Sequence, residues 1–417
     1  MLKQVEGSVA IAESVALCRP EVICAYPITP QTHIVEALSR MVKDGRLHPC
    51  EYINVESEFA ALSVAIGASA CGARAYTATA SQGILFMAEA VYNASGLGLP
   101  MVMTVGNRAI GAPINIWNDH TDSMALRDAG WIQLYAETNQ EAADLHIQAF
   151  RLSEAISLPV MVCVDGFILT HAYERVDVPT QEQVDAYLPR YEPRQVLDPA
   201  EPVTIGAMVG PEAFMEVRYL AHHRQMEAIG LIPELAAEFH AVFGRDSGGL
   251  LHAYRTEDAD TVVCALGSVN GTIKDVVDEL RDDGVRIGSI SLCSFRPFPM
   301  AALASAIGTA KRVVTIEKSL SIGIGGNLSH NLRMALQGRG GEVHTVIAGL
   351  GGRSITRESL RRVFREAIEN RLEPLSFLDL DRGVVERQLE RERQVRRSGP
   401  AAEAILRDIG AVAARPV

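Results

Sequence analysis

The sequence predicts an α/β protein built on a doubly wound parallel sheet, and three observations support this prediction. Short apolar runs typical of buried strands alternate with helical stretches through the first half of the chain. The same alternation resumes after residue 250. The 417 residues are enough for two or three domains, and the contents of 48% hydrophobic and 22% charged residues are ordinary for a globular protein.

The first unit begins with an apolar run that two prolines, Pro27 and Pro30, convert into a loop. The next stretch has apolar residues at helical spacing on one face, and the stretch after residue 58 is rich in Ala and Gly, which suits close helix packing. In order, we expect a strand Val22–Tyr26, a helix Gln31–Lys43, a strand Tyr52–Val55, a helix within Glu58–Ala73, and strands Ala75–Thr79, Met101–Val105 and Val160–Val164.

A polar, proline-punctuated stretch near residues 175–202 predicts a linker or an extended crossing segment, and Pro211–Phe243 after it is mostly helical in pattern. The second unit is expected to contain strands Thr261–Leu266, Val285–Leu292, Arg312–Ile316 and Glu342–Ile347, with a helix Gly271–Asp282. Charges of alternating sign over Asp381–Arg397 indicate an exposed helix. We therefore expect a first domain at 1–245 that includes the linker, a second at 250–375, and a charged extension at 376–417 that contacts a partner subunit.

Charge and cysteine usage exclude several classes of function. The net charge of -12 argues against a nucleic-acid partner, because phosphate binding needs a basic face. No run reaches the roughly 18 apolar residues of a membrane span, and Glu13 interrupts the apolar stretch Val9–Leu17, so we expect a cytoplasmic protein without a membrane. The seven cysteines are dispersed without a C-x-x-C pair, which excludes a local iron–sulfur or zinc motif.

Four loops of the first unit carry candidate functional residues. Thr29 offers a hydroxyl in a rigid Pro-Ile-Thr-Pro loop at the end of a strand, where open α/β sheets bind ligands. Glu58 opens an apolar helix, where the helix dipole favours a carboxylate. A plain turn and a first-turn capping residue are the ordinary alternatives for these two positions.

The other two loops follow the next strands. Small residues lead into Ser81-Gln82-Gly83, where a ligand or a partner backbone can approach closely. Arg108 follows a buried strand and has the geometry to hold a carboxylate with two hydrogen bonds, although such an arginine is as often a surface ion pair.

Taken together, these motifs form a recognisable series. It comprises Pro27-Ile28-Thr29-Pro30, Ser57-Glu58, Thr79–Gly83, Asn115–Asp119, Asp165–His171, Gly267–Thr272, Phe295–Pro299, Glu317-Lys318 and Gly349–Arg353. The series resembles the α subunit of the 2-oxoacid:acceptor oxidoreductases, the thiamine diphosphate enzymes that include pyruvate:ferredoxin oxidoreductase. The resemblance spans most of the chain.

The resemblance implies an enzyme subunit that shares its cofactor. The α chain supplies the pyrimidine-side domain and a transketolase C-terminal-like domain, whereas a β subunit holds the diphosphate and its magnesium; the G-D-G signature of that half is absent here. No metal site is expected in this chain. The 2-oxoacid is oxidatively decarboxylated to CO2 and an acyl-CoA, and electrons pass to iron–sulfur clusters in γ and ferredoxin-like subunits.

The resemblance also assigns roles to residues. Glu58 matches the glutamate that activates the aminopyrimidine ring, and Thr29 and Arg108 match the positions that bind the substrate. The remaining cofactor-binding positions are Pro27, Ile28, Ser81, Gln82, Asn115 and Asn118. The glycines of Gly323–Gly326 are interpreted as a structural turn, because they are not expected to lie between a strand and a helix as a nucleotide loop would.

Two departures bear on the substrate. Gln31-Thr32-His33 replaces a pair of serines common in pyruvate-type chains, and His120 stands where a Trp is common. The preferred substrate at this point is phenylglyoxylate, oxidised to benzoyl-CoA with electrons passed to NAD through a flavin (FAD) subunit. The alternative is pyruvate, oxidised to acetyl-CoA. A non-catalytic scaffold paralogue and a subunit of a lipoamide-using dehydrogenase are further alternatives.

Overall fold

The first structural unit is a seven-stranded sheet with helices on both faces. In the computed structural model, which describes residues 2–339, 341–393 and 401–411, all neighbouring strands of this sheet are parallel except the edge strand β12. The strand order is β12 (Ser294–Arg296), β6 (Ile132–Tyr135), β7 (Val160–Asp165), β5 (Val102–Asn107), β4 (Ala75–Thr79), β2 (Val22–Ala25) and β3 (Glu51–Asn54).

Helices cover the two faces of this sheet and create two cores. One core contains apolar residues of α1, α2, α7 and α9, and the other contains residues of α3, α4, α5 and α6. The helices are α1 (Gly7–Leu17), α2 (Thr32–Lys43), α3 (Glu58–Ala70), α4 (Ser81–Phe86), α5 (Ala88–Gly96), α6 (Thr121–Ala125), α7 (Asn139–Ile156), α8 (Gln181–Tyr187) and α9 (Phe214–Phe243). The central strands β5 and β7 are buried along their whole length, which explains their continuous apolar sequence.

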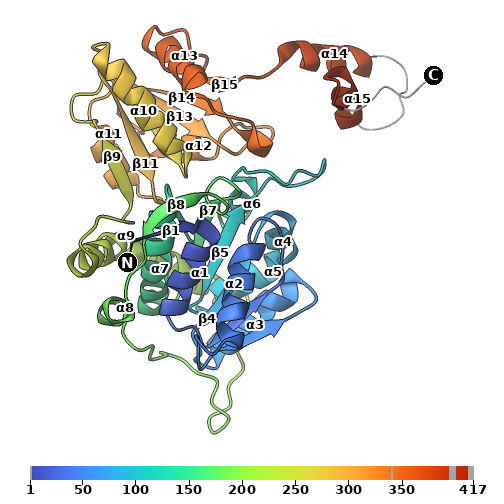
Figure 1. Ribbon diagram of the computed structural model, residues 1–417, viewed down its shortest axis with the longest axis vertical. Helices are drawn as coiled ribbons and strands as arrows, with labels where there is room; N and C mark the ends of the chain where they lie inside the picture. Colours follow the sequence, from blue (N-terminus) through green and yellow to red (C-terminus); the bar gives the residue numbers. More distant parts are fainter. Residues whose placement is uncertain (1, 340, 394–400, 412–417) are drawn as a thin grey trace.

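The second unit is a six-stranded sheet, placed beside the first along the long axis of the molecule (Figure 1). Its strand order is β15 (Leu375–Phe377), β14 (Glu342–Ile347), β13 (Arg312–Glu317), β10 (Thr261–Leu266), β11 (Ile287–Leu292) and β9 (Leu251–Tyr254). Its helices are α10 (Val269–Asp282), α11 (Met300–Ile307), α12 (Leu328–Ala335), the 3-10 turn η1 (Leu350–Gly352) and α13 (Arg357–Ile368). Only β9 runs antiparallel to its neighbour.

The two units share packing. Strand β12 follows β11 in the chain but pairs with β6 of the first sheet. One core cluster also contains residues of both units, such as Trp131 and Met161 of the first and Ile290 and Leu328 of the second. The predicted division near residue 250 therefore separates the two sheets, although the segment 294–296 returns to the first one.

These observations confirm the predicted fold class and correct one element. The stretch predicted as a linker near 175–202 contains β8 (Tyr173–Asp177), which pairs with β1 (Leu2–Glu6), and helix α8. The start of α8 carries a capping box, in which Thr180 and Gln183 each accept a hydrogen bond from the other's backbone N–H. The prolines around it make this capping box difficult to recognise in the sequence.

The reason given for the structural turn at Gly323–Gly326 is also corrected, although the interpretation itself is kept. These glycines do lie between a strand, β13, and a helix, α12. The Glu317 carboxylate nevertheless occupies the helix N-terminus, where it accepts hydrogen bonds from the N–H groups of Leu328 (2.8 Å) and Ser329 (3.0 Å). A Cβ atom at Gly326 would lie 1.9 Å from Glu317 Oε1, so the glycine makes room for this carboxylate. The turn is structural, because the Glu317 carboxylate occupies the position that a phosphate would take in a nucleotide-binding loop.

The chain ends in two short helices that extend away from the second sheet (Figure 1). Helix α14 (Arg382–Glu392) lies within the predicted charged helix, whose last residues, 394–397, are outside the described residues. Helix α15 (Ala401–Asp408) is bound to it by the ion pair of Arg391 with Asp408 (2.7 Å). Within the described ranges, none of the helices combines the length and apolar character required to cross a membrane.

Arg74 joins several elements at the edge of the first sheet that is opposite the candidate site. Its guanidinium donates two hydrogen bonds to Glu154 of α7 (2.5 and 2.9 Å), one to the Cys18 carbonyl and one to the Pro189 carbonyl. The Arg74 side chain is only 9% exposed and that of Glu154 12% exposed. This ion pair is therefore largely removed from water.

We predict that Arg74→Met lowers the free energy of unfolding by about 3–5 kcal/mol, because it leaves the Glu154 carboxylate buried without its partner. The double variant Arg74→Met/Glu154→Met should recover a large part of that loss, since both charges are then removed together. Equilibrium denaturation of the three proteins measures both effects. Equal stabilities of the single and double variants would contradict the prediction.

Candidate functional site

Four sequence-predicted residues meet at one edge of the first sheet. Glu58 follows β3, Thr29 follows β2, Ser81 follows β4 and Arg108 follows β5, and these four strands are neighbours in the sheet. Because parallel strands all end at the same edge, this order brings the four loops together. The site therefore arises from the topology and not from any single loop.

The buried carboxylate of Asp122 ties two of these loops to each other. Its Oδ2 accepts hydrogen bonds from the backbone N–H groups of Ser81 (2.9 Å) and Arg108 (3.0 Å). Its Oδ1 accepts from the Asn107 side-chain amide (2.7 Å) and from the N–H of Ser123 (2.8 Å). Because Asp122 is fully buried, these four hydrogen bonds take the place of the water that would otherwise solvate its charge.

Two opposing effects set the protonation of Asp122. Burial raises the pKa of this carboxyl group, and the four hydrogen bonds lower it, with the result that the pKa is raised from 3.8 to about 6. The group is therefore ionised at neutral pH. An ionised carboxylate is what the surrounding donors require, because it can only accept hydrogen bonds.

Arg108 and Thr29, the two positions that the resemblance assigns to the substrate, lie in contact. Arg108 Nη1 donates to the Thr29 carbonyl oxygen (2.9 Å), and Nε donates to the carbonyl of Asn115 (3.2 Å). Its Nη2 has no hydrogen-bond partner among the described residues. Burial lowers the pKa of Arg108, and the nearby Asp122 charge partly offsets that effect. The guanidinium thus keeps free donors for an anionic ligand beside an exposed threonine.

Glu58 is held at the start of α3 with its carboxylate directed toward the β4–α4 turn. Ser57 caps the helix by accepting a hydrogen bond from the N–H of Ala60 (3.2 Å). A Cβ atom at Gly83 would lie 2.8 Å from Glu58 Oε1 and 2.6 Å from Thr79 Oγ1, so only glycine leaves both oxygens their space.

Neither of these two oxygens has a partner within the described chain. Thr79 Oγ1 is buried without a hydrogen bond, and the Glu58 side chain, only 8% exposed, makes none to another described residue. A buried polar group without a partner is costly, which points to a polar ligand at this position. The donors of an aminopyrimidine ring fit this requirement of Glu58.

The β4–α4 turn is strained at Ser81, which has a positive φ of 49°. The Ser81 hydroxyl donates to the carbonyl of Ala109 (2.5 Å) and also contacts Gln82 Oε1, so it is used to hold the loop. Pro27 is exposed and Ile28 is half-buried at the tip of the first loop. The structure thus places Pro27, Ile28, Ser81 and Gln82 at the carboxyl ends of the strands. The Ser81 hydroxyl is already used in hydrogen bonds within the chain.

The side chains of Asn115 and Asn118, which the sequence predicts to bind the cofactor, form hydrogen bonds within the chain. The Asn115 side chain donates to the Gly351 carbonyl of the second unit (3.2 Å) and accepts from the N–H of Trp117 (2.7 Å). The Asn118 amide donates to the Asn107 carbonyl (3.2 Å) and lies 3.4 Å from Asp165 Oδ1. These contacts give both side chains a role in joining the loop at residues 112–120 to the rest of the protein.

A second buried carboxylate, Asp165, connects this loop to the second unit. It accepts a hydrogen bond from Lys318 Nζ (2.8 Å) and from the N–H of Ser268 (3.0 Å), and it shares one with His120 Nε2 (2.6 Å). Burial alone would raise the pKa of Asp165, but the charges of Lys318 and His120 hold it well below its usual range. His120, noted in the sequence as an unusual residue, is thus part of the contact between units.

Asp122 was not identified from the sequence, and no role of its own was given to Asn107, which precedes Arg108 in the fourth loop, or to Gly166, which lies within the Asp165–His171 motif. Gly166 follows β7, and a Cβ atom there would meet the Asn107 carbonyl at 2.4 Å and Pro30 Cγ at 2.6 Å. Its only sequence signal was an Asp-Gly pair after a buried strand. Asp122 carried even less, since an acidic residue in the first turn of a short helix is ordinary.

Comparison with known proteins agrees with this geometry. The family model of pyruvate flavodoxin/ferredoxin oxidoreductase, thiamine diphosphate-binding, matches residues 13–236, and the model of pyruvate:ferredoxin oxidoreductase core domain II matches residues 259–360. The chain is 49% identical over 367 residues to pyruvate synthase subunit PorA of Methanosarcina barkeri, covering 87% of this chain and 91% of that protein. It is 39% identical over 364 residues to ketoisovalerate oxidoreductase subunit VorA of Pyrococcus abyssi, covering 87% and 92%.

A solved structure shares the fold. It is 2-oxoglutarate:ferredoxin oxidoreductase from Magnetococcus marinus with 2-oxoglutarate, coenzyme A and succinyl-CoA bound. The superposition has a TM-score of 0.70 at 18% sequence identity and covers 88% of this chain. The present chain spans 65% of that longer chain.

The raised pKa of Asp122 predicts a distinctive pH dependence. Because the folded state binds this proton more tightly than the unfolded state, Asp122 lowers the free energy of unfolding as pH rises from about 4 to about 6. We predict that Asp122→Asn destabilises the chain by about 1–3 kcal/mol at pH 7, since its amide nitrogen would face N–H donors. The deficit should grow by up to about 3 kcal/mol toward pH 4, where the wild type keeps its proton.

Denaturant unfolding at both pH values measures this deficit. Asp275→Asn is a matched control, because Asp275 is exposed on α10, and it should parallel the wild type at each pH. A deficit of the Asp122 variant that is the same at pH 4 and pH 7 would contradict the assigned protonation.

Proposed function

Because this chain belongs to the pyruvate flavodoxin/ferredoxin oxidoreductase family, as the α subunit of a thiamine diphosphate-dependent 2-oxoacid oxidoreductase that forms an acyl-CoA, we propose that its substrate is pyruvate. The identity to a pyruvate synthase subunit, 49%, exceeds the 39% to a ketoisovalerate oxidoreductase subunit and carries this proposal. The preference for phenylglyoxylate and for NAD with a flavin subunit, drawn from two sequence departures, has no such support. Pyruvate, the sequence-based alternative, replaces it.

The hydrogen bonds of Gln31 and His120 account for the two sequence departures without reference to the substrate. Gln31 is fully buried and donates to the carbonyls of Tyr26 (2.8 Å) and Ala78 (3.2 Å), so it holds the loop in place. His120 is bound to Asp165 at the contact between the two units. Neither side chain is described in contact with Thr29 or Arg108. In this proposal Gln31 and His120 serve the scaffold and do not select the substrate.

Thiamine diphosphate, when bound, supplies the nucleophilic carbon and the electron sink that allow a 2-oxoacid to lose CO2. In this proposal the Glu58 carboxylate forms a hydrogen bond with the aminopyrimidine ring and holds the proton of that bond. The low-dielectric surroundings of a side chain that is 8% exposed strengthen such a bond. Pro27, Ile28 and the turn at Gln82 form the backbone wall around it.

Arg108 and Thr29 bind and orient the substrate in this proposal. The free donors of the Arg108 guanidinium pair with the carboxylate of pyruvate, and the Thr29 hydroxyl donates to its 2-oxo group. Asp122 fixes the Arg108 backbone, and the hydrogen bond from Arg108 Nη1 to the Thr29 carbonyl fixes the Arg108 side chain and the Thr29 backbone. Fixed partners of this kind hold a small substrate in one orientation.

We further propose that a β subunit supplies the diphosphate half of the site and that coenzyme A accepts the acyl group. All seven cysteines are unpaired and dispersed, and within the described ranges no cluster of potential metal ligands contains a cysteine. Iron–sulfur clusters that accept the electrons therefore belong to γ and ferredoxin-like subunits. The extension at 376–417 is a candidate contact with such a partner, since Leu389 and Ile409 are exposed on α14 and beyond α15.

The substrate is tested with the complex purified anaerobically through a tag on this chain. Coenzyme A-dependent dye reduction is measured with pyruvate, 2-oxoglutarate, a branched 2-oxoacid and phenylglyoxylate. We predict the highest kcat/KM for pyruvate. A higher value for any of the other three acids would overturn the substrate assignment, and its identity would name the correct one.

The role of Glu58 is tested by Glu58→Gln in the same complex. We predict that turnover falls by at least about 100-fold, because the amide cannot hold the proton that the carboxylate holds. The matched control Glu56→Gln, which changes an exposed residue two positions earlier, should retain wild-type turnover. Unchanged turnover of Glu58→Gln in an assembled complex would remove Glu58 from the chemistry.

A further inference from the structure

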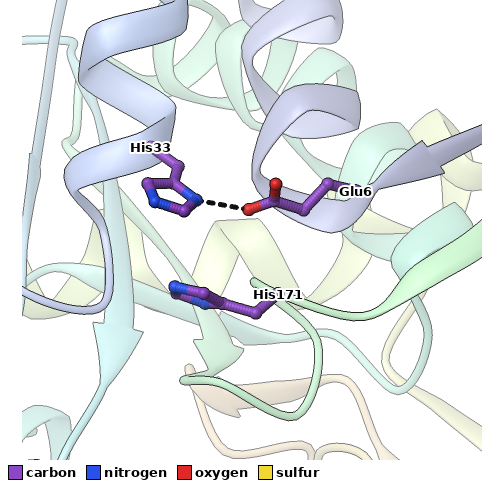
Figure 2. A group of neighbouring side chains, drawn as sticks. All are labelled: Glu6, His33 and His171. Carbon is purple, nitrogen blue, oxygen red and sulfur yellow. Dashed lines mark hydrogen bonds and ion pairs between the residues drawn. The ribbon is translucent and has the colours of Figure 1, made fainter.

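Three potential metal ligands converge on the surface beside the first loop of the site. Figure 2 shows Glu6, His33 and His171 grouped together, each from a different part of the chain. Glu6 ends β1, His33 lies in the first turn of α2, and His171 lies in the loop between β7 and β8. Within the described residues, this is the single group of three or more such side chains that meets the geometry of a metal site.

The distances suit one small ion. One ligand atom from each residue lies within 4.8 Å of the other two, and His33 Nδ1 is 2.6 Å from Glu6 Oε1. Bonds of about 2.1 Å to zinc place two ligands of one ion up to about 4.2 Å apart. Small side-chain rotations close the remaining difference, and the His33 side chain is 47% exposed and has room to rotate.

His171 is prepared to act as a neutral ligand. Its Nδ1 lies 2.7 Å from Thr170 Oγ1, and in the tautomer that donates this hydrogen bond the lone pair is on Nε2. Thr170 is itself fixed, because its hydroxyl oxygen accepts from the N–H of Phe167 (2.8 Å). Burial and the neighbouring His33 lower the pKa of His171. A neutral imidazole is the form that binds metal.

An ordinary ion pair accounts for only part of this arrangement. Glu6 and His33 alone would form one, and the third residue would not be needed. His171 instead lies between two rings, 4.7 Å from the His33 ring and 4.8 Å from the Phe167 ring, measured between centroids. This packing holds a second imidazole beside the carboxylate, which adds a ligand to the pair.

We propose that Glu6, His33 and His171 bind a divalent transition-metal ion, with Zn2+ as the best fit. Two imidazoles and one carboxylate form a ligand set that zinc uses, with water in the fourth position. Binding displaces the proton shared by His33 and Glu6. The ion would join the start of α1, the start of α2 and the β7–β8 loop. Because α2 begins directly after the loop that carries Thr29, the ion would also brace that loop.

The test measures binding of Zn2+ to the full chain in its complex by competition with a chromogenic chelator. His33→Gln and His171→Gln each remove one ligand, and His222→Gln is the matched control, since His222 is exposed on α9 and remote from the cluster. We expect the wild type and His222→Gln to bind one more equivalent per chain than the two ligand variants. The affinity at this site should fall at least about 100-fold in both, the upper end of the loss seen when only a supporting hydrogen bond is removed.

Substitution with Co2+ gives a second readout that does not depend on enzyme activity. The visible absorption of four-coordinate Co2+ should appear in the wild type and in His222→Gln and be absent from both ligand variants. Equal binding by all four proteins, or no extra equivalent in the wild type, would overturn the proposal. Loss in only one of the two ligand variants would also overturn it, because it would exclude a site of three residues.

Discussion

The candidate site depends on the solvation of one buried carboxylate. Asp122 has no access to water, and it obtains its hydrogen bonds from the backbone N–H groups at the start of two loops, at Ser81 and Arg108. Because an unsolvated carboxylate is so costly, the two loops must adopt the conformations that supply those donors. The positive φ of Ser81 is one consequence, since it is retained only where surrounding contacts require it. Arg108 is thereby placed beside Thr29.

The same principle operates between the two sheets. Asp165 ends β7 in the first unit and is paired with Lys318, which follows β13 in the second. Asn107 of β5, the register partner of Asp165, donates a hydrogen bond to Asp122 of α6, so one polar network connects the two carboxylates. The loop at residues 112–120 is held by this network on one side and by Gly351 on the other. A shift of the second unit would therefore move the loops of the site.

Sequence reasoning succeeded where local pattern carries the information. The loops with Thr29, Ser81 and Arg108 follow buried strands, and Glu58 follows the partly exposed edge strand β3. The alternation of strands and helices is enough to place all four strand ends at one edge. It failed where a contact joins distant segments. Asp122 was not predicted, and Asp165 and Lys318 were quoted only within matching motifs, without the ion pair that joins them across 153 positions. The hydrogen bonds of Asn115 to the second unit and of Asn118 to the ends of β5 and β7 are likewise contacts that no local pattern indicates.

The site described for this chain is one half of a shared site in the proposed assembly. Glu58 makes no hydrogen bond to another described residue, and Arg108 has free donors. Both groups are therefore suited to bind a ligand. The most direct measurement is a structure of the assembled complex with thiamine diphosphate and pyruvate. We predict that the Glu58 carboxylate lies within about 3 Å of the aminopyrimidine ring and that the Arg108 guanidinium binds the pyruvate carboxylate. A cofactor bound away from Glu58, or a substrate that leaves Arg108 unpaired, would contradict it.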